Sequence, residues 1–229
     1  MAKKKKIYFV TGTDTGVGKT EVSCALLLAW RNLNLSTLAC KPIASGVDKI
    51  NGKLINSDVL KLHSAMTESV DLELINPVLI DEPVGPSVYN LHHDKKINFN
   101  DLLAQCESLI AHDVDRVLIE GIGGWFVPID LVFSLPDLIK KLCPEIIIVV
   151  GLKLGCINHA LLTEAAIRNA GLNIKGWIAN QIDPELLYVD EVIQSIQSRI
   201  KSPLLAFFPY ISTEKSLFFP ENIVIDCDI

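Results

Sequence analysis

The sequence lacks any long hydrophobic run, any excess of positive charge and any paired-cysteine motif. Its longest unbroken apolar run, from Ile146 to Leu152, is far too short to cross a bilayer. The formal net charge of -6 argues against a nucleic-acid partner, which usually requires a basic face. The six cysteines include no C-x-x-C pair and no histidine at zinc spacing: Cys24, Cys40, Cys106, Cys143, Cys156 and Cys227. We therefore expect no membrane span and mostly buried thiols in a reducing cytoplasm.

The amino terminus carries the one concentrated positive charge, a run of lysines from Lys3 to Lys6. A secretory signal would continue into a longer apolar segment, whereas this chain reaches a polar, glycine-rich stretch within four residues of Ile7. The run is therefore interpreted as a solvated fringe ahead of a strand, and a cytoplasmic location is expected.

Short apolar segments alternate with helical patterns along all 229 residues. Six segments have the length and composition of buried strands: 7–10, 36–41, 117–119, 146–150, 174–179 and 204–208. Two helical patterns, at 158–170 and 184–200, are the clearest, whereas prolines and a glycine break the stretch 76–94. This alternation predicts an α/β fold with a mostly parallel sheet and helices on both faces, which binds ligands at the carboxyl ends of its strands.

The stretch TGTDTGVGKT, from Thr11 to Thr20, follows the first strand and opens a helix. It resembles a phosphate-binding loop that is one residue longer than the usual pattern. Backbone N–H groups around Gly16 and Gly18 can surround phosphates, Lys19 can reach the β and γ phosphates, and Thr20 can bind magnesium. With the predicted sheet, this loop indicates a single-domain P-loop NTPase fold over residues 1–229.

Further polar residues follow other predicted strands. Glu120 ends an apolar strand where a second magnesium-binding acid is found in phosphate-loop sites. Lys41 and Ser45 follow the second strand, where a lysine can offset charge during phosphoryl transfer. Asp58 fits either a metal ligand or a helix cap, and Asn158 fits either a carboxylate site at a helix start or the cap of that helix. Asp14 and Glu21 suit helix-terminal acids, and neither is assigned a catalytic role.

Six segments, in this order and at these separations, closely resemble the dethiobiotin synthetase family: FVTGTDTGVGKT, CKPIASG, NSD, IEGIGGWFVPI, VVGLKLGCINHALLT and WIAN. The resemblance covers roughly residues 7–180. It implies a homodimeric, ATP- and Mg²⁺-dependent cyclo-ligase of biotin biosynthesis. Its substrates would be 7,8-diaminopelargonate, CO2 and ATP, with reaction through a carbamate and a carbamic-phosphoric mixed anhydride to dethiobiotin, ADP and phosphate.

The resemblance also implies roles for individual residues. The magnesium ligands would be Thr20, Asp58 and Glu120. The catalytic residues would be Lys41, Lys19 and Thr15. The residues contacting the diamine substrate would be Thr15, Lys41, Ser45, Gly123, Gly155, Cys156 and Asn158, with the last three across a dimer interface. The residues contacting the nucleotide would be Gly16, Val17, Gly18, Lys19, Thr20, Asp58, Glu120, Asn180, Pro209, Tyr210 and Ile211.

Two departures and two alternatives accompany the resemblance. Gly16 stands where some family members carry an acidic residue, so nucleotide selectivity could differ. Beyond Asn180 the resemblance thins, which leaves Tyr188 and Glu214 without an assigned role.

A nucleotide-switch ATPase of the partitioning or metallocluster-carrier kind resembles this chain in its loop, but residues 13–17 lack the additional lysine of that class. An amidotransferase of cobalamin synthesis would need a glutaminase domain, for which 229 residues leave no room.

Overall fold

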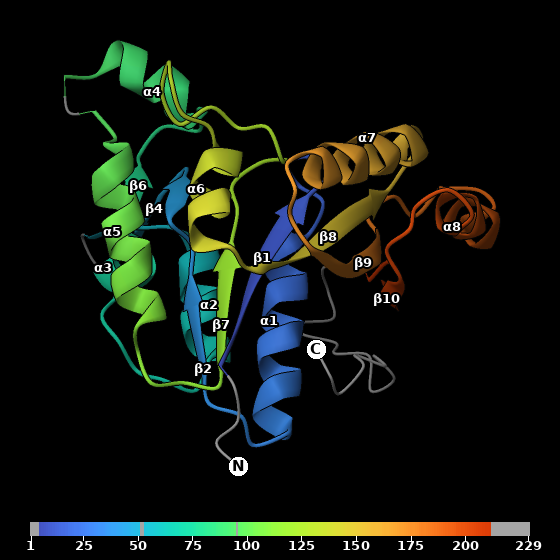
Figure 1. The fold of residues 1–229 in the computed structure, drawn as a ribbon, viewed down its shortest axis with the longest axis horizontal. Helices are drawn as coiled ribbons and strands as arrows, with labels where there is room; N and C mark the ends of the chain where they lie inside the picture. Colours follow the sequence, from blue (N-terminus) through green and yellow to red (C-terminus); the bar gives the residue numbers. More distant parts are fainter. Residues whose placement is uncertain (1–4, 51–52, 95, 212–229) are drawn as a thin grey trace.

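The centre of the protein is a six-stranded, entirely parallel β-sheet (Figure 1). The computed structural model describes residues 5–50, 53–94 and 96–211. Along the sheet the strands run in the order β10, β9, β8, β1, β7, β2. Their bounds are β1 Lys6–Gly12, β2 Thr37–Cys40, β7 Arg116–Glu120, β8 Glu145–Leu152, β9 Ile174–Gln181 and β10 Leu204–Phe208. The predicted fold class and all six predicted strands are thus confirmed.

Burial explains why these segments form strands. Every residue of β2 and β7 is buried, and so is all of β8 except Glu145, as expected for strands covered on both faces. The register aligns the strand ends: Val10 pairs with Glu120, and Gly12 pairs with Val149. The loop after β1 therefore lies between the carboxyl ends of β7 and β8.

Helices cover the two faces of the sheet. The α-helices are α1 Lys19–Asn32, α2 Ser57–Ala65, α3 Leu72–Ile75, α4 Pro86–His92, α5 Phe99–Ile110, α6 Leu135–Leu142, α7 Cys156–Asn169 and α8 Val189–Gln197. The chain moves from β1 through α1 toward the β2 edge of the sheet, and from β8 through α7 toward the β10 edge. Because both crossovers are right-handed, these opposite directions put α1 and α7 on opposite faces. Accordingly, α1 packs on β1, β7 and α2, and α7 packs on β8, β9 and α8. Among the described helices, none combines the length and apolar character needed to cross a membrane.

Short elements fill the long connection between β2 and β7. They are β3 Ile43–Ser45, β4 Asp48–Ile50, β5 Lys53–Ile55 and β6 Val78–Ile80. β3 pairs with β6 in parallel, and β4 pairs with β5 in an antiparallel hairpin. The stretch 76–94, predicted to contain no long element, holds only β6 and α4.

Helix α8 is shorter than its sequence pattern. The pattern predicts a helix from 184 to 200, yet the helix begins at Val189. The carboxylate of Asp183 accepts the N–H of Glu185, and Tyr188 adopts a left-handed backbone conformation with φ 56°. This turn delays the start of the helix although the apolar spacing continues through it.

The cysteines largely match their predicted role. Four are free and buried: Cys24, Cys40, Cys106 and Cys156. Cys143, which follows α6 in a left-handed conformation, is exposed, and Cys227 lies outside the described residues.

Glu164 joins α7 to the segment that leads into β10. Its Oε1 atom accepts hydrogen bonds from Arg168 Nε at 2.9 Å, from the Lys201 and Ser202 N–H groups at 2.9 and 3.1 Å, and from Ser202 Oγ at 3.0 Å. Burial alone would raise the pKa of Glu164, but the hydrogen bonds from Arg168, Ser202 and Lys201 outweigh it and lower that pKa. The ionised carboxylate therefore stabilises the fold.

We expect Glu164→Gln to lower the free energy of unfolding by about 1 kcal/mol at pH 7, because a charged acceptor is replaced by a neutral one. The pKa of Glu164 in the folded state lies below the ordinary value of 4.5. The stability that its ionised carboxylate contributes is therefore fully present above pH 4.5 and is lost as the pH falls through the folded-state pKa. Urea unfolding at pH 7 and at pH 3 measures the difference. Glu107→Gln, on the exposed face of α5, is the matched control, and equal stability of both variants at pH 7 would contradict the assignment.

Candidate phosphate-transfer site

The loop between β1 and α1 has the backbone conformation of a phosphate-binding loop. Gly18 immediately precedes α1 with φ 84°, so Lys19 and Thr20 form the first turn of the helix. A β-carbon at Gly18 would lie 2.1 Å from Asn180 Nδ2, and the left-handed conformation further disfavours any other residue there. The free N–H groups and the positive end of the helix dipole at this turn favour an anion.

Lys19 is held over this loop by uncharged partners. Its Nζ donates to the carbonyl oxygens of Gly123 at 2.7 Å and of Asp14 at 3.2 Å. Burial lowers the pKa of Lys19 to about 8, against a smaller opposing effect of Glu120. An anionic ligand can therefore replace carbonyl contacts without separating an existing ion pair.

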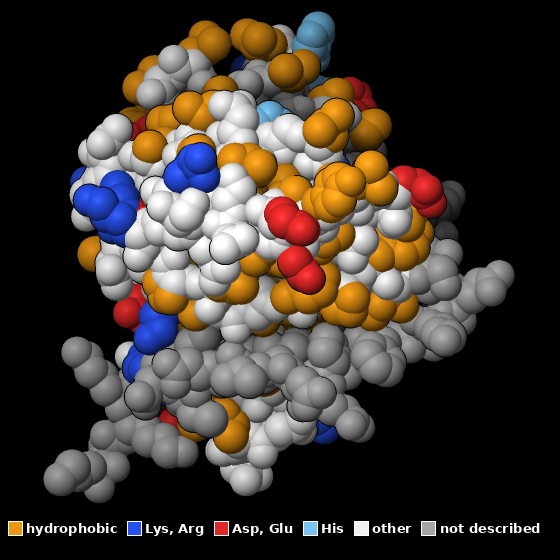
Figure 2. Space-filling view, turned by 90° about the vertical axis from the view of Figure 1, so that its right-hand side faces the viewer, with side chains coloured by type: hydrophobic (Ala, Val, Ile, Leu, Met, Phe, Trp, Pro, Cys, Tyr) orange, Lys and Arg blue, Asp and Glu red, His pale blue; other side chains and the backbone are white. Residues whose placement is uncertain are grey.

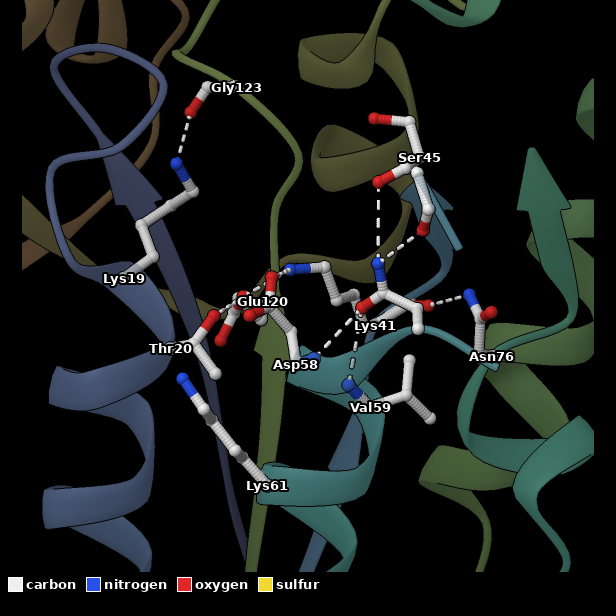
Figure 3. Close-up of polar contacts among 12 residues, drawn as sticks. Lys19, Thr20, Lys41, Ser45, Asp58, Val59, Lys61, Asn76, Glu120 and Gly123 are labelled. Atoms are coloured by element: carbon white, nitrogen blue, oxygen red, sulfur yellow. Dashed lines mark hydrogen bonds and ion pairs between the residues drawn. The ribbon is translucent and has the colours of Figure 1, made fainter. Parts of the chain in front are cut away.

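Glu120 is the centre of a buried polar cluster (Figure 3). Its side chain is fully buried, and its Oε1 atom accepts Thr20 Oγ1 at 2.7 Å and Lys41 Nζ at 2.7 Å. Lys41 also donates to Asp58 Oδ2 at 2.6 Å. Residues from β7, α1, α2 and the segment after β2 thus meet at one point, as the parallel strand order predicts.

The charges of this cluster stabilise one another. Burial alone would lower the pKa of Lys41, but Glu120 and Asp58 outweigh it and raise that pKa. Burial alone would raise the pKa of Asp58, but the charge and hydrogen bond of Lys41, together with Lys61 and Thr20, outweigh it and lower that pKa. Lys41 is therefore a fixed ammonium group at neutral pH.

The cluster and the loop line a cavity of about 250 Å³. Ten predicted site residues line it: Thr15, Gly16, Gly18, Lys19, Thr20, Lys41, Ser45, Asp58, Glu120 and Gly123. Glu21, Gly121 and Ile122 complete the lining. A larger and more open hollow of about 610 Å³ is lined by residues of 69–74 and by Gln105, and it contains none of the lysines or loop glycines that a phosphate requires.

The oxygen atoms of the cluster suit Mg²⁺. Glu120 Oε2 is buried without a hydrogen-bond partner, which is a costly state for a carboxylate oxygen unless a ligand satisfies it. Thr20 Oγ1 and Lys41 both donate to the Glu120 carboxylate, and Lys41 also donates to Asp58. Within residues 5–50, 53–94 and 96–211 no group of three acidic, histidine or cysteine ligands occurs. The carboxylates of Glu120 and Asp58 and the hydroxyl of Thr20 therefore fit an ion whose remaining ligands would be phosphate and water.

Four of the residues predicted to contact the nucleotide, Asn180 and Pro209 to Ile211, lie on the other side of the loop and would contact its adenine base. Asn180, near the end of β9, donates its Nδ2 to the Val17 carbonyl at 2.8 Å. Phe208 pairs with Asn180, so Pro209, Tyr210 and Ile211 follow directly beside it. The sheet thus places these residues together next to the loop, whereas Glu214 lies outside the described part of the chain.

The predicted carboxylate-binding residues at the start of α7 are separate from this cavity. Gly155 and Asn158 are exposed, and the buried Cys156 donates its N–H to the Lys153 carbonyl. The residue preceding α7 is Gly155, which has no side-chain capping bond, so Asn158 does not cap the helix. Within one chain, these three residues do not join the lysines and glycines of the loop.

Sequence reasoning missed several residues that support the site. Asn56, and not Asp58, caps α2: its Oδ1 accepts the N–H groups of Asp58 and Val59, which leaves the Asp58 carboxylate free to face Lys41. Asn56 Nδ2 also donates to the Gly46 carbonyl at 2.8 Å, and Asn76 Nδ2 donates to the Lys41 carbonyl at 2.7 Å. An asparagine before a helix is a detectable capping signal, whereas the long-range bond of Asn76 leaves no local pattern.

We expect Gly18→Ala to abolish measurable nucleotide binding, because the new methyl group would collide with Asn180 and displace the loop. Gly171→Ala is the matched control: Gly171 also has a left-handed backbone, with φ 75°, but no atom lies within 4 Å of the added carbon. That control should lose only about 1 kcal/mol of stability. Isothermal titration with Mg-ADP measures both variants, and normal affinity of Gly18→Ala would contradict the geometry of the loop.

Comparison with known proteins agrees with this geometry. A family model described as an AAA domain matches residues 6–215. Among solved structures, the septum site-determining protein MinD of Pyrococcus horikoshii superposes with a TM-score of 0.56 at 21% identity, covering 90% of this chain and 82% of that chain. A ParA family ATPase of Chlorobium tepidum gives a TM-score of 0.53 at 15% identity, covering 92% and 86%. These likenesses establish the P-loop NTPase fold.

Curated relatives are similar over nearly the whole chain. The ATP-dependent dethiobiotin synthetase BioD of Cellvibrio japonicus is 41% identical over 208 residues, which cover 91% of both chains. The ATP-dependent dethiobiotin synthetase BioD 1 of Escherichia coli K12 is 39% identical over 217 residues, covering 95% of this chain and 94% of the relative. The chain therefore belongs to the family of the ATP-dependent dethiobiotin synthetases.

Proposed function

We propose that the protein catalyses the ATP-dependent closure of the ureido ring of dethiobiotin from 7,8-diaminopelargonate and CO2, a step of biotin biosynthesis. The observation that carries this proposal is the Lys41 ammonium, buried beside the phosphate loop and fixed by two carboxylates. A lysine so placed can hold an anionic acceptor next to a transferring phosphoryl group. The names of the relatives supply the use of ATP and the product, dethiobiotin, and the family resemblance supplies the diamine substrate.

In the proposed reaction, one neutral amine of the substrate attacks CO2 and loses a proton to solvent, which gives a carbamate. The carbamate oxygen attacks the γ-phosphorus of ATP, and ADP leaves. The second amine then attacks the carbonyl carbon of the mixed anhydride, expels phosphate and loses a proton to solvent, which closes the ring. Each step places negative charge near two lysines, so the residues act by orienting reactants and by offsetting charge.

The residues of the cavity divide these tasks. Lys19 and the loop N–H groups would bind the β and γ phosphates, and Lys41 would bind the carbamate and the transferring group. Thr15, Ser45 and the backbone of Gly123 line the cavity and would contact the diamine end. Mg²⁺, held by Thr20, Asp58 and Glu120, would neutralise charge on the β and γ phosphates when bound.

A nucleotide-switch ATPase is the second candidate, favoured by the likeness to MinD and ParA. That likeness extends only to the fold. Residues 13–17, Thr-Asp-Thr-Gly-Val, also lack the additional loop lysine of that class.

The test is phosphate release by the purified protein with ATP, magnesium and bicarbonate, with and without diaminopelargonate, while mass spectrometry follows dethiobiotin. Release that depends on the diamine and yields dethiobiotin is the expected result. Release that is indifferent to the diamine, without product, would reject the ligase and favour the switch ATPase.

We expect Lys41→Met to reduce kcat at least a hundredfold, because charge on the transferring group then loses its fixed ammonium partner. The Kd for Mg-ADP should stay within about threefold, since Lys19 and the loop remain, and this binding also verifies folding. Lys140→Met is the control: it removes an exposed lysine in the last turn of α6. Lys41→Met with more than a tenth of normal turnover would remove Lys41 from the mechanism.

We further propose that the working form is a homodimer in which the start of α7 from one subunit completes the partner's site. Figure 2 looks onto the side that carries α8 and shows apolar side chains over much of the described surface, with few charged groups. Four large apolar side chains are strongly exposed: Phe126 and Leu131 in the loop between β7 and α6, Leu154 just before α7, and Leu162 within α7. Such apolar exposure is typical of a protein-binding surface.

We expect Asn158→Ala to raise KM for diaminopelargonate about tenfold and to leave KM for ATP nearly unchanged, because the helix start would bind the substrate carboxylate and not the nucleotide. Steady-state kinetics with each substrate varied separately gives both constants. An unchanged KM for the diamine would place the carboxylate elsewhere.

A further inference from the structure

Asp14 gives the long phosphate loop its shape. Its Oδ1 atom accepts the Thr15 N–H at 2.8 Å, and its carbonyl oxygen accepts Lys19 Nζ at 3.2 Å. The loop has one residue more than the usual pattern between Gly12 and Gly18, and Asp14 orders this longer segment through its side chain and backbone.

The same carboxylate opposes the function of the loop. The Asp14 side chain is 44% exposed. It belongs to the loop whose Lys19 and N–H groups would receive an anionic nucleotide. An unpaired negative charge within the phosphate loop would repel the phosphates. The fold therefore has to neutralise the charge while keeping Asp14 as a hydrogen-bond acceptor.

Lys153 lies against this carboxylate. Its Nζ is 3.0 Å from Asp14 Oδ2, the oxygen that Thr15 does not use. The hydrogen bond from Lys153, followed by that from Thr15, lowers the pKa of Asp14, so this carboxyl is ionised at neutral pH. The two residues are 139 positions apart in the sequence.

The backbone fixes Lys153 relative to the loop. The Thr13 N–H donates to the Val149 carbonyl of β8 at 3.0 Å, and a β-carbon at Gly151 would lie 2.8 Å from Val17 Cγ1, so the loop packs directly on the end of β8. The Lys153 carbonyl accepts the Cys156 N–H at 3.0 Å, which joins the lysine to the start of α7.

We propose that Lys153 is a positioning residue of the phosphate loop, whose ammonium holds and neutralises Asp14 so that a nucleoside polyphosphate enters without facing an unpaired carboxylate. Lys153 acts through Asp14 and does not touch the nucleotide. The part of this inference that concerns turnover rests on the proposed function, whereas the part that concerns nucleotide binding does not.

A double-mutant cycle on Mg-ADP binding tests the proposal. Lys153→Met should raise the Kd about fivefold at low ionic strength. This factor corresponds to the upper end of the coupling measured for partly exposed ion pairs. The same substitution in an Asp14→Asn background should change the Kd by less than twofold, because the asparagine keeps the acceptor for Thr15 but carries no charge. Lys140→Met is the control: it removes an exposed lysine in the last turn of α6 and should leave the Kd within twofold.

Three further measurements separate this role from a structural one. Lys153→Arg should restore the Kd, since it restores the charge. Salt at about 0.5 M should remove most of the difference between Lys153→Met and the parent, because it screens exposed charges. In the ligase reaction Lys153→Met should raise KM for ATP more than it lowers kcat.

An equal effect of Lys153→Met in both backgrounds would mean that the lysine contacts the nucleotide itself, and the proposal would be wrong. A normal Kd of Lys153→Met at low salt, or a loss that Lys153→Arg does not restore, would equally overturn it. Because ADP binding requires neither the diamine nor bicarbonate, these results remain readable if the protein does not form dethiobiotin.

Discussion

The site depends on the burial of Glu120 at the carboxyl end of β7. A fully buried carboxylate is unfavourable unless a positive group and hydrogen-bond donors surround it. Lys41 and Thr20 provide both on Oε1, and Lys41 in turn fixes Asp58. Removing Lys41 would leave the fully buried carboxylate of Glu120 without its positive partner.

Strand order makes this cluster possible. β7 lies between β1 and β2, although β2 follows β1 in the chain. The right-handed connection through α1 leaves room for one strand, and β7 fills it much later in the sequence. Glu120 thereby comes to lie between Thr20, which follows β1, and Lys41, which follows β2. The other neighbour of β1, β8, supports the opposite side of the loop through Gly151 and Lys153.

The sequence predicted what depends on strand ends and on backbone conformation. Six apolar segments identified the strands because most of their residues are buried, on both faces in β2, β7 and nearly all of β8. Glu120, Lys41 and Lys19 could be expected to meet because parallel strands end at one edge. The late start of α8 was missed, since the hydrogen bond at Asp183 overrides an apolar pattern that continues through the turn. The bond of Asn76 to the Lys41 carbonyl was also missed, because a contact between residues so far apart has no sequence period.

Two lysines in one cavity have opposite electrostatic environments, and this difference suits different tasks. Lys19 has only carbonyl hydrogen-bond partners and a pKa lowered by burial to about 8, so an arriving phosphate supplies its first direct contact with an anion. Lys41 already contacts two carboxylates, and its pKa is raised. Binding of a phosphate therefore gains most free energy at Lys19, whereas the position of Lys41 is set before any ligand arrives. A preorganised charge costs no rearrangement when negative charge shifts between oxygens during phosphoryl transfer, and this condition favours the transition state over the bound substrates.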